Sequence, residues 1–335
     1  MKLGRLNLKN NLILSPMMNV TSSPYRNFCR HFNEVGLVCV PMLYTKRLMK
    51  NPKSVEQELY KIEEERPISI QLIGNDINAL KSAINYLESY NFDVLDINAG
   101  CPSKRAITAN EGGALLKDLD NLKNLLSVAL KFSSKAISLK TRLGFTNSDI
   151  NFLNELANVL NTSGINFATI HARLIKYRLN DSKLDLKGLK YLKKLSQIPI
   201  IGNGDIIDPY TAKRMIDYTN VDAIMIGRGS MGYPEIFFHI HEYLSNAREI
   251  FHQNNISLMK SYTELYEKYI DEFLEGITLN YPNKEFKFAE LKRNAIWLTK
   301  DIKDSTSIRR DLSNAKNLKQ LKNILQNIDE KHKIS

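Results

Sequence analysis

The sequence predicts a (β/α)8 TIM barrel followed by an all-helical C-terminal domain. Over the first two thirds of the chain, short runs of nearly continuous apolar residues alternate with amphipathic stretches. Parallel strands that are covered on both faces have this apolar pattern, and eight strand–helix units close a barrel. From about Phe237 the strand-like runs stop and helical periodicity continues alone. A doubly wound sheet is the alternative fold, but no GxGxxG motif follows the first apolar run.

The apolar runs give the predicted strands in chain order. They span Leu12–Ser15, Leu37–Val40, Ile68–Ile73, Val94–Ile97, Ala136–Lys140, Phe167–His171, Ile198–Gly202 and Ala223–Gly227. The amphipathic stretches between them predict helices at Ala79–Tyr90, Leu119–Lys131, Asp149–Leu160, Leu186–Leu195 and Pro209–Tyr218. We expect the barrel to span residues 1–240, with its exit at Tyr233–Pro234, and the helical domain to span residues 241–335.

Composition narrows the class of protein. The 335 residues carry a formal net charge of +11, which indicates an anionic partner such as nucleic acid. Three cysteines without CxxC spacing argue against a disulfide framework and a cysteine-based zinc site, and the histidines lack ligand spacing. No apolar stretch has the length of a membrane span or a signal peptide. We expect a cytoplasmic protein that uses no metal and no membrane.

Polar residues follow most of the predicted strands. Barrel proteins gather their catalytic and binding groups at the carboxyl ends of the strands. Here these positions hold Pro16, Met17, Gln71, Asn98, Cys101, Lys140, Arg142, His171, Arg173, Asn203, Asp205 and Arg228. The pattern therefore predicts one ring of side chains that includes amides, a thiol, a lysine, an imidazole and several arginines.

The loops after the last two predicted strands resemble an anion site. Gly204 and Gly227 let backbone N–H groups approach an anion closely, and Arg228 adds a fixed positive charge. Phosphate binds at this position in many barrels. Alternatively, the glycines serve only to make tight turns.

Lys140 stands at the end of an otherwise buried strand. An unpaired buried ammonium group is unfavourable, so this lysine needs an anionic or polar partner. It is a candidate Schiff-base lysine, a donor to a flavin ring, or the partner of a core carboxylate. His171 is also consistent with an ordinary hydrogen-bonded core histidine.

Cys101 lies between Gly100 and Pro102, in a turn directly after a predicted strand. The residues alone leave five roles for it: metal ligand, disulfide partner, nucleophile, proton donor, or a thiol that merely occupies a turn. The cysteine count argues against the first two.

Several segments, in the same order along the chain, resemble the flavin-dependent tRNA-dihydrouridine synthases. They are SPMMNVTSSPYR, QLIGND, DINAGCPSKRAI with the later GGALLKD, KTRLGF, HAR, IGNGDI and IGRGSMGYPEIF. The GCP segment with its GGALL run is the most specific, whereas KTR, HAR and GNGD are strong only together. The segment FKFAELKRNAIWLTKDIKDSTSIRRDL is more loosely similar to the family's helical tRNA-binding region.

The resemblance implies an enzyme that holds FMN at the carboxyl face of the barrel and takes electrons from NADPH or NADH. Hydride from the reduced flavin goes to C6 of a uracil in tRNA, and Cys101 gives C5 its proton. The implied cofactor-binding residues are Pro16, Met17, Gln71, Lys140, His171, Asn203, Gly204, Asp205, Gly227 and Arg228. Asn98, Arg142 and Arg173 are implied to lie near the uracil. We expect the protein to act as a monomer.

The chemistry of a thiol suits the implied role of Cys101. Hydride addition at C6 leaves enolate character at C5, which a nearby acid must quench. An ordinary thiol is largely protonated at neutral pH. Lys104 and Arg105 are adjacent cations that favour a thiolate, which leaves the protonation state of this cysteine open.

Two segments depart from the family pattern. Met18 and Asn19 replace the commoner alanine–glycine pair after the methionine of the first motif, at the flank of the implied cofactor site. The segment ARLIKYRLNDSKLDLKGL lacks the threonine–arginine and aromatic–glycine pattern expected after HAR. Uracil contacts from that loop are therefore expected from Arg173 alone.

The C-terminal region supplies candidate tRNA contacts. Residues 284–322 contain 11 lysines and arginines against 5 aspartates and glutamates. A helix predicted over 286–302 carries an apolar stripe, and on a neighbouring face lie Arg293, Trp297 and Lys300. Two cations around a tryptophan suit a phosphate and a stacked base, although Trp297 is equally suited to a helical core. Arg309 and Arg310 form a further basic patch.

Two other functions compete with this interpretation. A dihydroorotate dehydrogenase-like enzyme would share the barrel and FMN but act on a free pyrimidine. A non-catalytic RNA-binding protein would retain the barrel and the basic helices without flavin. The GCP turn and the basic helical region argue against the first, and flavin bound to the purified protein would exclude the second.

Overall fold

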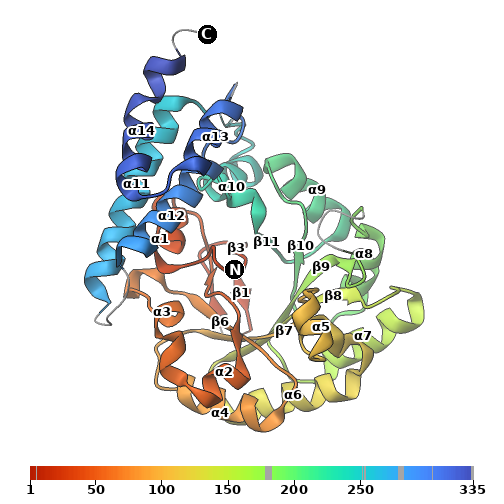
Figure 1. Cartoon of the computed structure of the whole chain (residues 1–335). Helices are drawn as coiled ribbons and strands as arrows, with labels where there is room; N and C mark the ends of the chain where they lie inside the picture. The colour runs from red at the N-terminus through yellow and green to blue at the C-terminus, as the bar shows by residue number, and fades with distance from the viewer. Residues whose placement is uncertain are drawn as a thin grey trace. The chain divides into compact units, whose positions relative to one another are not determined.

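The computed structural model describes residues 1–4, 6–177, 183–250, 252, 254–277, 283–303 and 305–332 (Figure 1). Contacts divide the chain into two compact units. The first contains Met1–Ser22 and Glu34–Arg228, and the second contains Ser23–Asn33 and Gly229–Ser335. The functional boundary expected between residues 240 and 241 stays a prediction.

The first unit is a parallel β-barrel, as predicted. Within the described residues its strands are β3 Leu12–Leu14, β4 Val38–Cys39, β6 Ile68–Ile73, β7 Val94–Ala99, β8 Ala136–Gly144, β9 Phe167–Leu174, β10 Ile200–Asn203 and β11 Ala223–Ile226. They are ordered β3-β11-β10-β9-β8-β7-β6-β4, and a parallel bridge between Ile13 and Leu37 joins the two ends. The short strand β5 (Leu43–Tyr44) also pairs with β6.

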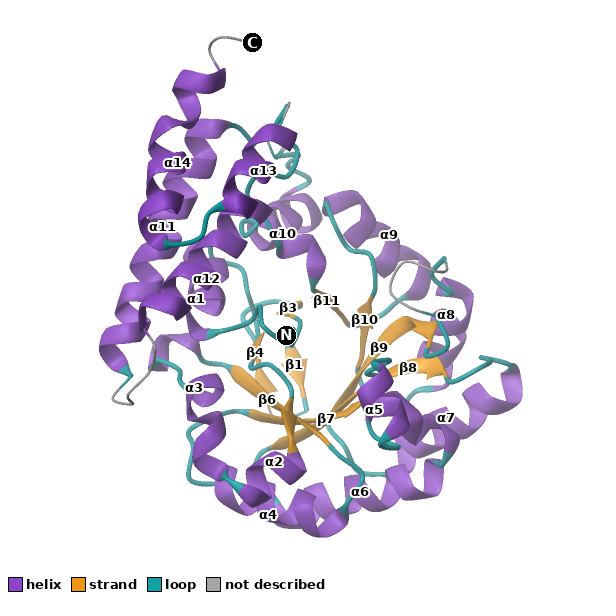
Figure 2. Cartoon of the chain, in the orientation of Figure 1, coloured by secondary structure: helices purple, strands orange, loops and turns teal. Residues whose placement is uncertain are grey.

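Helices surround this barrel (Figure 2). They are α2 Thr45–Lys50, α3 Glu56–Leu59, α4 Ile77–Leu87, α5 Lys104–Thr108, α6 Leu119–Phe132, α7 Ile150–Thr162, α8 Leu186–Leu195 and α9 Pro209–Thr219. Five of them begin after an aspartate whose carboxylate accepts the amide of the third helical residue: Asp76, Asp118, Asp149, Asp185 and Asp208. Such caps satisfy amides that the helix leaves unpaired and complement its dipole. These caps fix where the five helices begin.

The interior of the barrel is apolar at one end. Side chains of a strand alternate between its two faces, so every second residue points inward. The inward residues near the amino ends include Ile13, Val94 and Phe167, and they pack against Leu3 and Leu8. Leu3 belongs to an antiparallel pair, β1 Lys2–Leu3 and β2 Leu6–Asn7, which the sequence analysis did not predict. The space that remains inside the barrel is therefore at its carboxyl end.

The second unit is helical. It comprises α1 Ser23–His31, α10 Ile236–Asn246, α11 Ile256–Gly276, α12 Asn283–Trp297, α13 Thr306–Asn314 and α14 Leu318–His332. Helix α1 packs on α11 through Phe28, whose ring centroid lies 5.2 Å from that of Tyr266. Among the described residues, no helix has both the length and the apolar character needed to cross a membrane.

Candidate active site

Polar side chains replace the apolar ones at the carboxyl half of the barrel interior. The strand registers align Gln71 with Asp96 and Asp96 with Ser138, and one level further along they align Asn98 with Lys140. Beyond these, Arg142 aligns with His171, and His171 aligns with Asn203. The structure therefore brings the strand-end side chains together at one end of the barrel. Asp96, which the sequence analysis overlooked, lies among them.

A chain of hydrogen bonds runs from Asp96 to the backbone of Cys101. Asp96 accepts from Nε2 of Gln71 at 2.6 Å and from Oγ of Ser138 at 2.5 Å. Oε1 of Gln71 accepts from Nδ2 of Asn98 at 2.8 Å. Oδ1 of Asn98 then accepts the backbone N–H groups of Gly100 and Cys101, at 3.0 and 2.9 Å. Asn98 thus holds the turn that carries the thiol.

Burial raises the pKa of the Asp96 carboxyl to about 6. The hydrogen bonds from Ser138 and Gln71 and the charge of Lys140 oppose this effect. The signal that could have identified Asp96 is its position two residues before Asn98, which places both side chains on the same face of one strand.

The thiol of Cys101 is partly exposed, whereas Cys29 and Cys39 are buried. Its Sγ lies 3.3 Å from Oγ of Ser103, the residue that caps α5. The carbonyl of Cys101 accepts from the backbone N–H of Gly113 at 3.0 Å. The GG pair of the GGALL run thus packs directly against the cysteine turn.

Gly112 cannot carry a side chain without disturbing this turn. Its φ is +57°, and an added Cβ would lie 2.9 Å from Cβ of Cys101. We expect Gly112→Ala to lower catalytic activity about tenfold, because the turn that carries the thiol must shift. Steady-state kinetics would measure this effect.

The matched control is Gly164→Ala. Gly164 also has a positive φ, +84°, but an added Cβ would lie 3.6 Å from its nearest contact, Leu130. Both substitutions introduce backbone strain of about 1 kcal/mol, but only Gly112→Ala should reduce activity beyond its effect on the melting temperature. Equal activity losses in the two variants would contradict the prediction.

Lys140 lies on β8 and is partly buried. Its Nζ donates to Oδ1 of Asn203 at 3.3 Å, and among the residues described it forms no ion pair. Burial lowers the pKa of Lys140 to about 8, and the charge of Asp96 partly offsets this. The core carboxylate considered as a partner thus acts on Lys140 through its charge and not through a contact.

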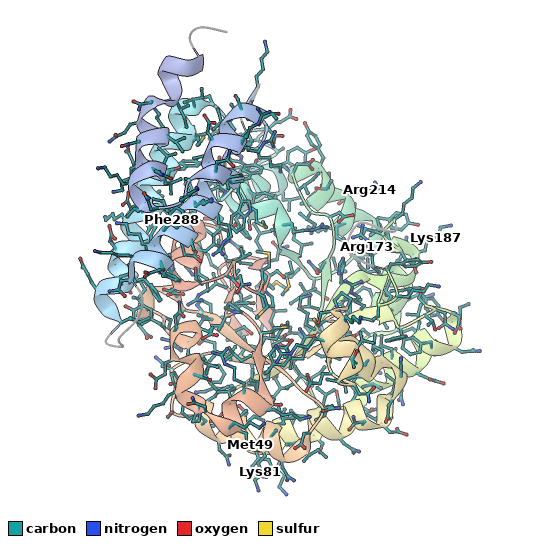
Figure 3. All side chains as sticks on the ribbon, in the orientation of Figure 1. Met49, Lys81, Arg173, Lys187, Arg214 and Phe288 are labelled. Atoms are coloured by element: carbon teal, nitrogen blue, oxygen red, sulfur yellow. The ribbon has the colours of Figure 1, made fainter. Side chains whose placement is uncertain are left out.

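His171 is neutral in this site. Burial lowers its pKa well below the usual value, and the positive charges of Lys140, Arg142, Arg173 and Arg228 lower it further. Its Nε2 lies 3.3 Å from Nη1 of Arg173, a residue labelled in Figure 3. A neutral imidazole at this position is able to accept or donate one hydrogen bond without adding charge.

Asp205 organises the loop after β10. Gly204 and Asp205 have φ values of +131° and +45°, which place both in the left-handed half of backbone space. The carboxylate of Asp205 accepts hydrogen bonds from both Nη atoms of Arg173. It also accepts one from Nη2 of Arg228 at 3.2 Å. These two arginines therefore share one carboxylate in this structure.

Arg142 holds the loop after β9, while its Nε has no hydrogen-bond partner among the described residues. Nη1 donates to the backbone oxygens of Leu174 and Tyr177, at 2.8 and 2.9 Å. Nε is buried and finds no hydrogen-bond acceptor among the described residues. Burial, and then the charge of Arg173, lowers the pKa of Arg142 to about 10, so it stays charged at neutral pH.

The segment after β3 makes a rigid wall. The backbone N–H of Met17 donates to Oγ1 of Thr21 at 3.0 Å, and that hydroxyl lies 3.1 Å from the carbonyl of Met17. Asn19 has a φ of +57°, a conformation that asparagine tolerates better than most residues. This explains how the sequence accommodates asparagine in place of the commoner glycine. Pro16 precedes this turn, and a Cβ at Gly227 would lie 3.5 Å from Sδ of Met17.

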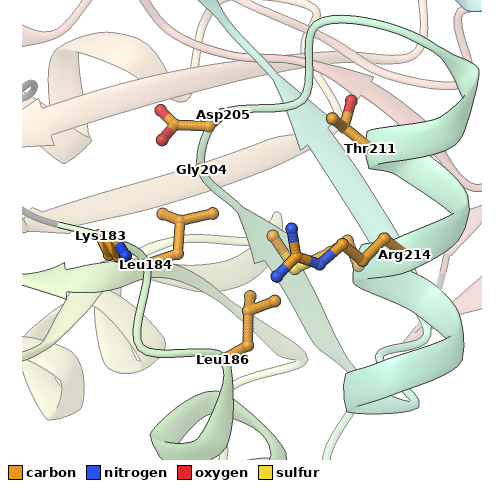
Figure 4. A pocket seen from close by; sticks show the side chains of 8 residues that line it. Lys183, Leu184, Leu186, Gly204, Asp205, Thr211 and Arg214 are labelled. Atoms are coloured by element: carbon orange, nitrogen blue, oxygen red, sulfur yellow. The ribbon is translucent and has the colours of Figure 1, made fainter.

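A pocket of about 440 Å³ borders the loop after β10. Its lining includes Leu184 before α8 and Leu186 at the start of α8, Gly204 and Asp205 of the loop, and Arg214 of α9. Figure 4 shows the guanidinium of Arg214 reaching from α9 toward Leu186 and Gly204. Part of the segment that departs from the family pattern, residues 178–182, lies outside the described residues.

The residues expected to contact tRNA lie in the helical unit. The guanidinium of Arg293 is 5.6 Å from the ring centroid of Trp297 and also pairs with Glu290. Trp297 is partly buried, and its ring packs edge-to-face on Tyr25 at 6.0 Å. Its environment thus combines core packing with partial exposure.

The helix predicted over 286–302 ends at Trp297. Turns follow it, and Asp301 has a φ of +62°, which is incompatible with a continuing helix. Lys300 therefore lies in a turn and not on the helical face that was expected. Arg309 and Arg310 are exposed on α13.

Solved structures of very different sequence share this fold. Morphinone reductase superposes with a TM-score of 0.53 at 12% identity, over 77% of this chain and 91% of that protein. Histamine dehydrogenase from Rhizobium sp. 4-9 superposes with a TM-score of 0.55 at 13% identity, over 80% of this chain and 50% of that protein. At such identities the likeness establishes the (β/α)8 fold alone.

Sequence comparison defines the family. The profile of the family described as Dihydrouridine synthase (Dus) matches residues 13–333. A protein of Vibrio vulnificus (strain CMCP6) named tRNA-dihydrouridine synthase B is 32% identical over 278 residues, which cover 82% of this chain and 85% of that protein. The protein of the same name from Escherichia coli (strain K12) is 31% identical, over 74% of this chain and 76% of that protein.

The fold and the family profile together make the chain an oxidoreductase of the flavin-dependent (β/α)8 class. Within that class, it belongs to the dihydrouridine synthase family. The resemblance inferred from the sequence motifs is thereby confirmed.

Proposed function

We propose that this dihydrouridine synthase reduces the C5–C6 double bond of uridines in tRNA, with FMN as its cofactor and NADPH or NADH as the reductant. The similar proteins that carry the name tRNA-dihydrouridine synthase B support tRNA as the substrate. The observation that carries the proposed chemistry is the Cys101 turn, which Asn98 holds at the carboxyl end of a barrel that also carries a partly buried lysine, Lys140.

The donor set of the site fits FMN. A flavin has a planar ring with hydrogen-bonding edges, a polyol chain and one phosphate. Gln71, Lys140 and Asn203 offer amide and ammonium groups inside the barrel for the ring edge, and Pro16 and Met17 offer an apolar wall. His171, Gly204, Asp205, Gly227 and Arg228 are assigned to the polar chain and the phosphate. When bound, FMN supplies the hydride.

The chain's own residues then orient the base and supply the proton. We assign Cys101 as the acid that protonates C5. The unpartnered Nε of Arg142 is available for an acceptor on the uracil, since a buried donor without a partner is unfavourable. We also assign Arg173 to the base, and its position beside His171 supports this assignment. Oδ1 of Asn98 already accepts two backbone N–H groups, so Asn98 acts on the base chiefly by holding the Cys101 turn.

The reaction of the purified protein tests this function. We expect the protein to retain flavin and to form dihydrouridine in unmodified tRNA when NADPH or NADH is supplied, as detected by mass spectrometry of digested tRNA. Consumption of dihydroorotate without any product in tRNA would favour the free-pyrimidine enzyme. A colourless protein that binds tRNA but takes up no FMN would favour the non-catalytic alternative.

Substrate binding is assigned in part to the helical unit, through Arg293, Trp297, Lys300, Arg309 and Arg310. The protein is expected to work in the cytoplasm, because its substrate is located there. It is also expected to act as a monomer.

Arg309→Ala/Arg310→Ala is expected to weaken tRNA binding several-fold. Each lost phosphate contact should reduce the slope of log affinity against log salt by about one. Filter binding at several salt concentrations measures both quantities. Lys268→Ala on α11 removes an exposed cation that pairs with Glu272, and it should leave the slope unchanged. A double variant with the wild-type slope would contradict phosphate binding at α13.

A further inference from the structure

We infer that Asp96 is a positioning residue whose carboxylate fixes the direction of the hydrogen-bond chain through Gln71 and Asn98 to the Cys101 turn. This inference deepens the proposed function, because it concerns the residue assigned there as the proton donor. Asp96 lies on β7, between Gln71 of β6 and Ser138 of β8, with which it is in register. Only 6% of its surface is exposed.

The hydrogen-bond chain runs in one donor-to-acceptor direction, because a carboxylate only accepts hydrogen bonds. Ser138 and Gln71 must therefore both donate to Asp96, which turns the NH₂ group of Gln71 toward the carboxylate. The oxygen of Gln71 then faces Asn98 and accepts from its NH₂ group.

This leaves the oxygen of Asn98 for the turn. It accepts the N–H groups of Gly100 and Cys101, which no amide NH₂ group is able to do. If Gln71 were reversed, its oxygen would face the negative charge of Asp96 and its NH₂ group would face that of Asn98. The negative charge at one end of the chain thus fixes which atom of Asn98 holds the thiol turn.

A purely structural role does not account for a carboxylate at this position. Burying a carboxylate inside a barrel is unfavourable unless it is well paired, and an apolar side chain of similar size would fill the same space. Among the residues described, Lys140 is the charged group whose field lowers the pKa of Asp96. Its Nζ donates a hydrogen bond to Asn203 and not to Asp96. Although burial raises the pKa of Asp96 to about 6, the group is ionised at neutral pH.

The test substitutes Asp96→Asn, which keeps the shape of the side chain but adds a donor. The introduced amide is then able to donate to Oε1 of a reversed Gln71, and the reversal passes along to Asn98, whose NH₂ group would face the N–H groups of the turn. We expect Cys101 of the flavoprotein to react with iodoacetamide about fivefold faster, because the turn loses two hydrogen bonds. Cys29 and Cys39 are buried and should react little. Peptide mapping identifies which cysteine carries the label.

A second substitution should restore the direction. In Asp96→Asn/Gln71→Glu the carboxylate moves to position 71, accepts from the amide introduced at position 96, and again accepts from Nδ2 of Asn98. We expect the double variant to regain the wild-type alkylation rate. Ser138→Ala removes a donor to Asp96 without reversing Gln71 and serves as the matched control, with an expected rate close to that of wild type.

The outcomes separate a positioning role from a structural one. An unchanged rate in folded Asp96→Asn overturns the inference, as does a double variant that reacts no more slowly than the single one. If Asp96→Asn fails to fold, a double variant that folds and reacts at the wild-type rate supports the inference, and the failure of both overturns it. Alkylation is measured without tRNA. The test of the hydrogen-bond chain is therefore independent of whether the proposed activity is correct.

Discussion

Cys101→Ala is expected to retain its flavin and to be reduced by NADPH or NADH as fast as the wild-type protein, yet to form dihydrouridine at least about 100-fold more slowly. The substitution removes the assigned proton donor and leaves the backbone turn intact, because Asn98 and Gly113 bind only main-chain atoms of residue 101. Stopped-flow reduction of the flavin and reoxidation by tRNA measure the two half-reactions separately.

The reductive half-reaction is the internal control of this experiment. A general loss of structure would slow both half-reactions, whereas loss of the proton donor slows only the second. Cys101→Ser should also slow the reoxidation by tRNA and leave the reduction unchanged, because a serine hydroxyl is a much weaker acid than a thiol. If Cys101→Ala reoxidises with tRNA at the wild-type rate, Cys101 is not the acid.

The strands of the barrel were predictable because they are buried on both faces. Every predicted apolar run overlaps an observed strand, although β7, β8, β9 and β10 continue beyond the predicted ends, to Ala99, Gly144, Leu174 and Asn203. Those extensions contain Arg142 and Arg173, whose charges made the segments look like loops. The pair β1–β2 was missed because two-residue strands carry no periodicity.

The composition of the site was predictable, but its pairings were not. A barrel places strand ends side by side, which suffices to predict that Lys140, His171 and Asn203 gather. The pairing of Arg173 with Asp205, 32 positions away in the sequence, depends on the left-handed backbone of the loop after β10. Asp96 was overlooked because it lies inside an apolar run, where only the inward register of β7 gives it a role.

The early end of α12 was not predictable either. It depends on the turns that follow Trp297 and on the left-handed backbone of Asp301. Periodicity of apolar residues continues through this segment, so the sequence pattern alone does not reveal where the helix stops.

Lys140→Met is expected to have opposite effects on function and on stability. Methionine keeps the unbranched stem but removes the ammonium group that is assigned to the flavin ring. We expect the purified variant to contain little flavin, or to be reduced at least about tenfold more slowly by NADPH or NADH. Absorbance of the purified protein and stopped-flow reduction measure these effects.

The stability effect follows from the pKa of Lys140. Because burial lowers this pKa to about 8, from a usual value near 10.5, folding favours the neutral amine. The contribution of the neutral amine to the free energy of unfolding is therefore fully present only above the pKa of the unfolded state. It is lost as the pH falls through about 8. At neutral pH the charged lysine destabilises the flavin-free protein by up to about 3 kcal/mol, since one pKa unit corresponds to about 1.4 kcal/mol.

The flavin-free Lys140→Met protein should thus melt at a higher temperature than the flavin-free wild type, and the difference should grow as the pH falls from about 9 to about 7. The loss of the hydrogen bond to Asn203 and of the charge opposite Asp96 reduces the gain without changing its pH dependence over this range. A suitable control is Lys193→Met, which removes a barrel lysine from an ion pair with Asp222 and should lower the melting temperature slightly. A Lys140→Met protein that is less stable than wild type throughout this pH range would show that the ammonium group serves the fold. Greater stability without flavin would show that Lys140 is retained for the cofactor.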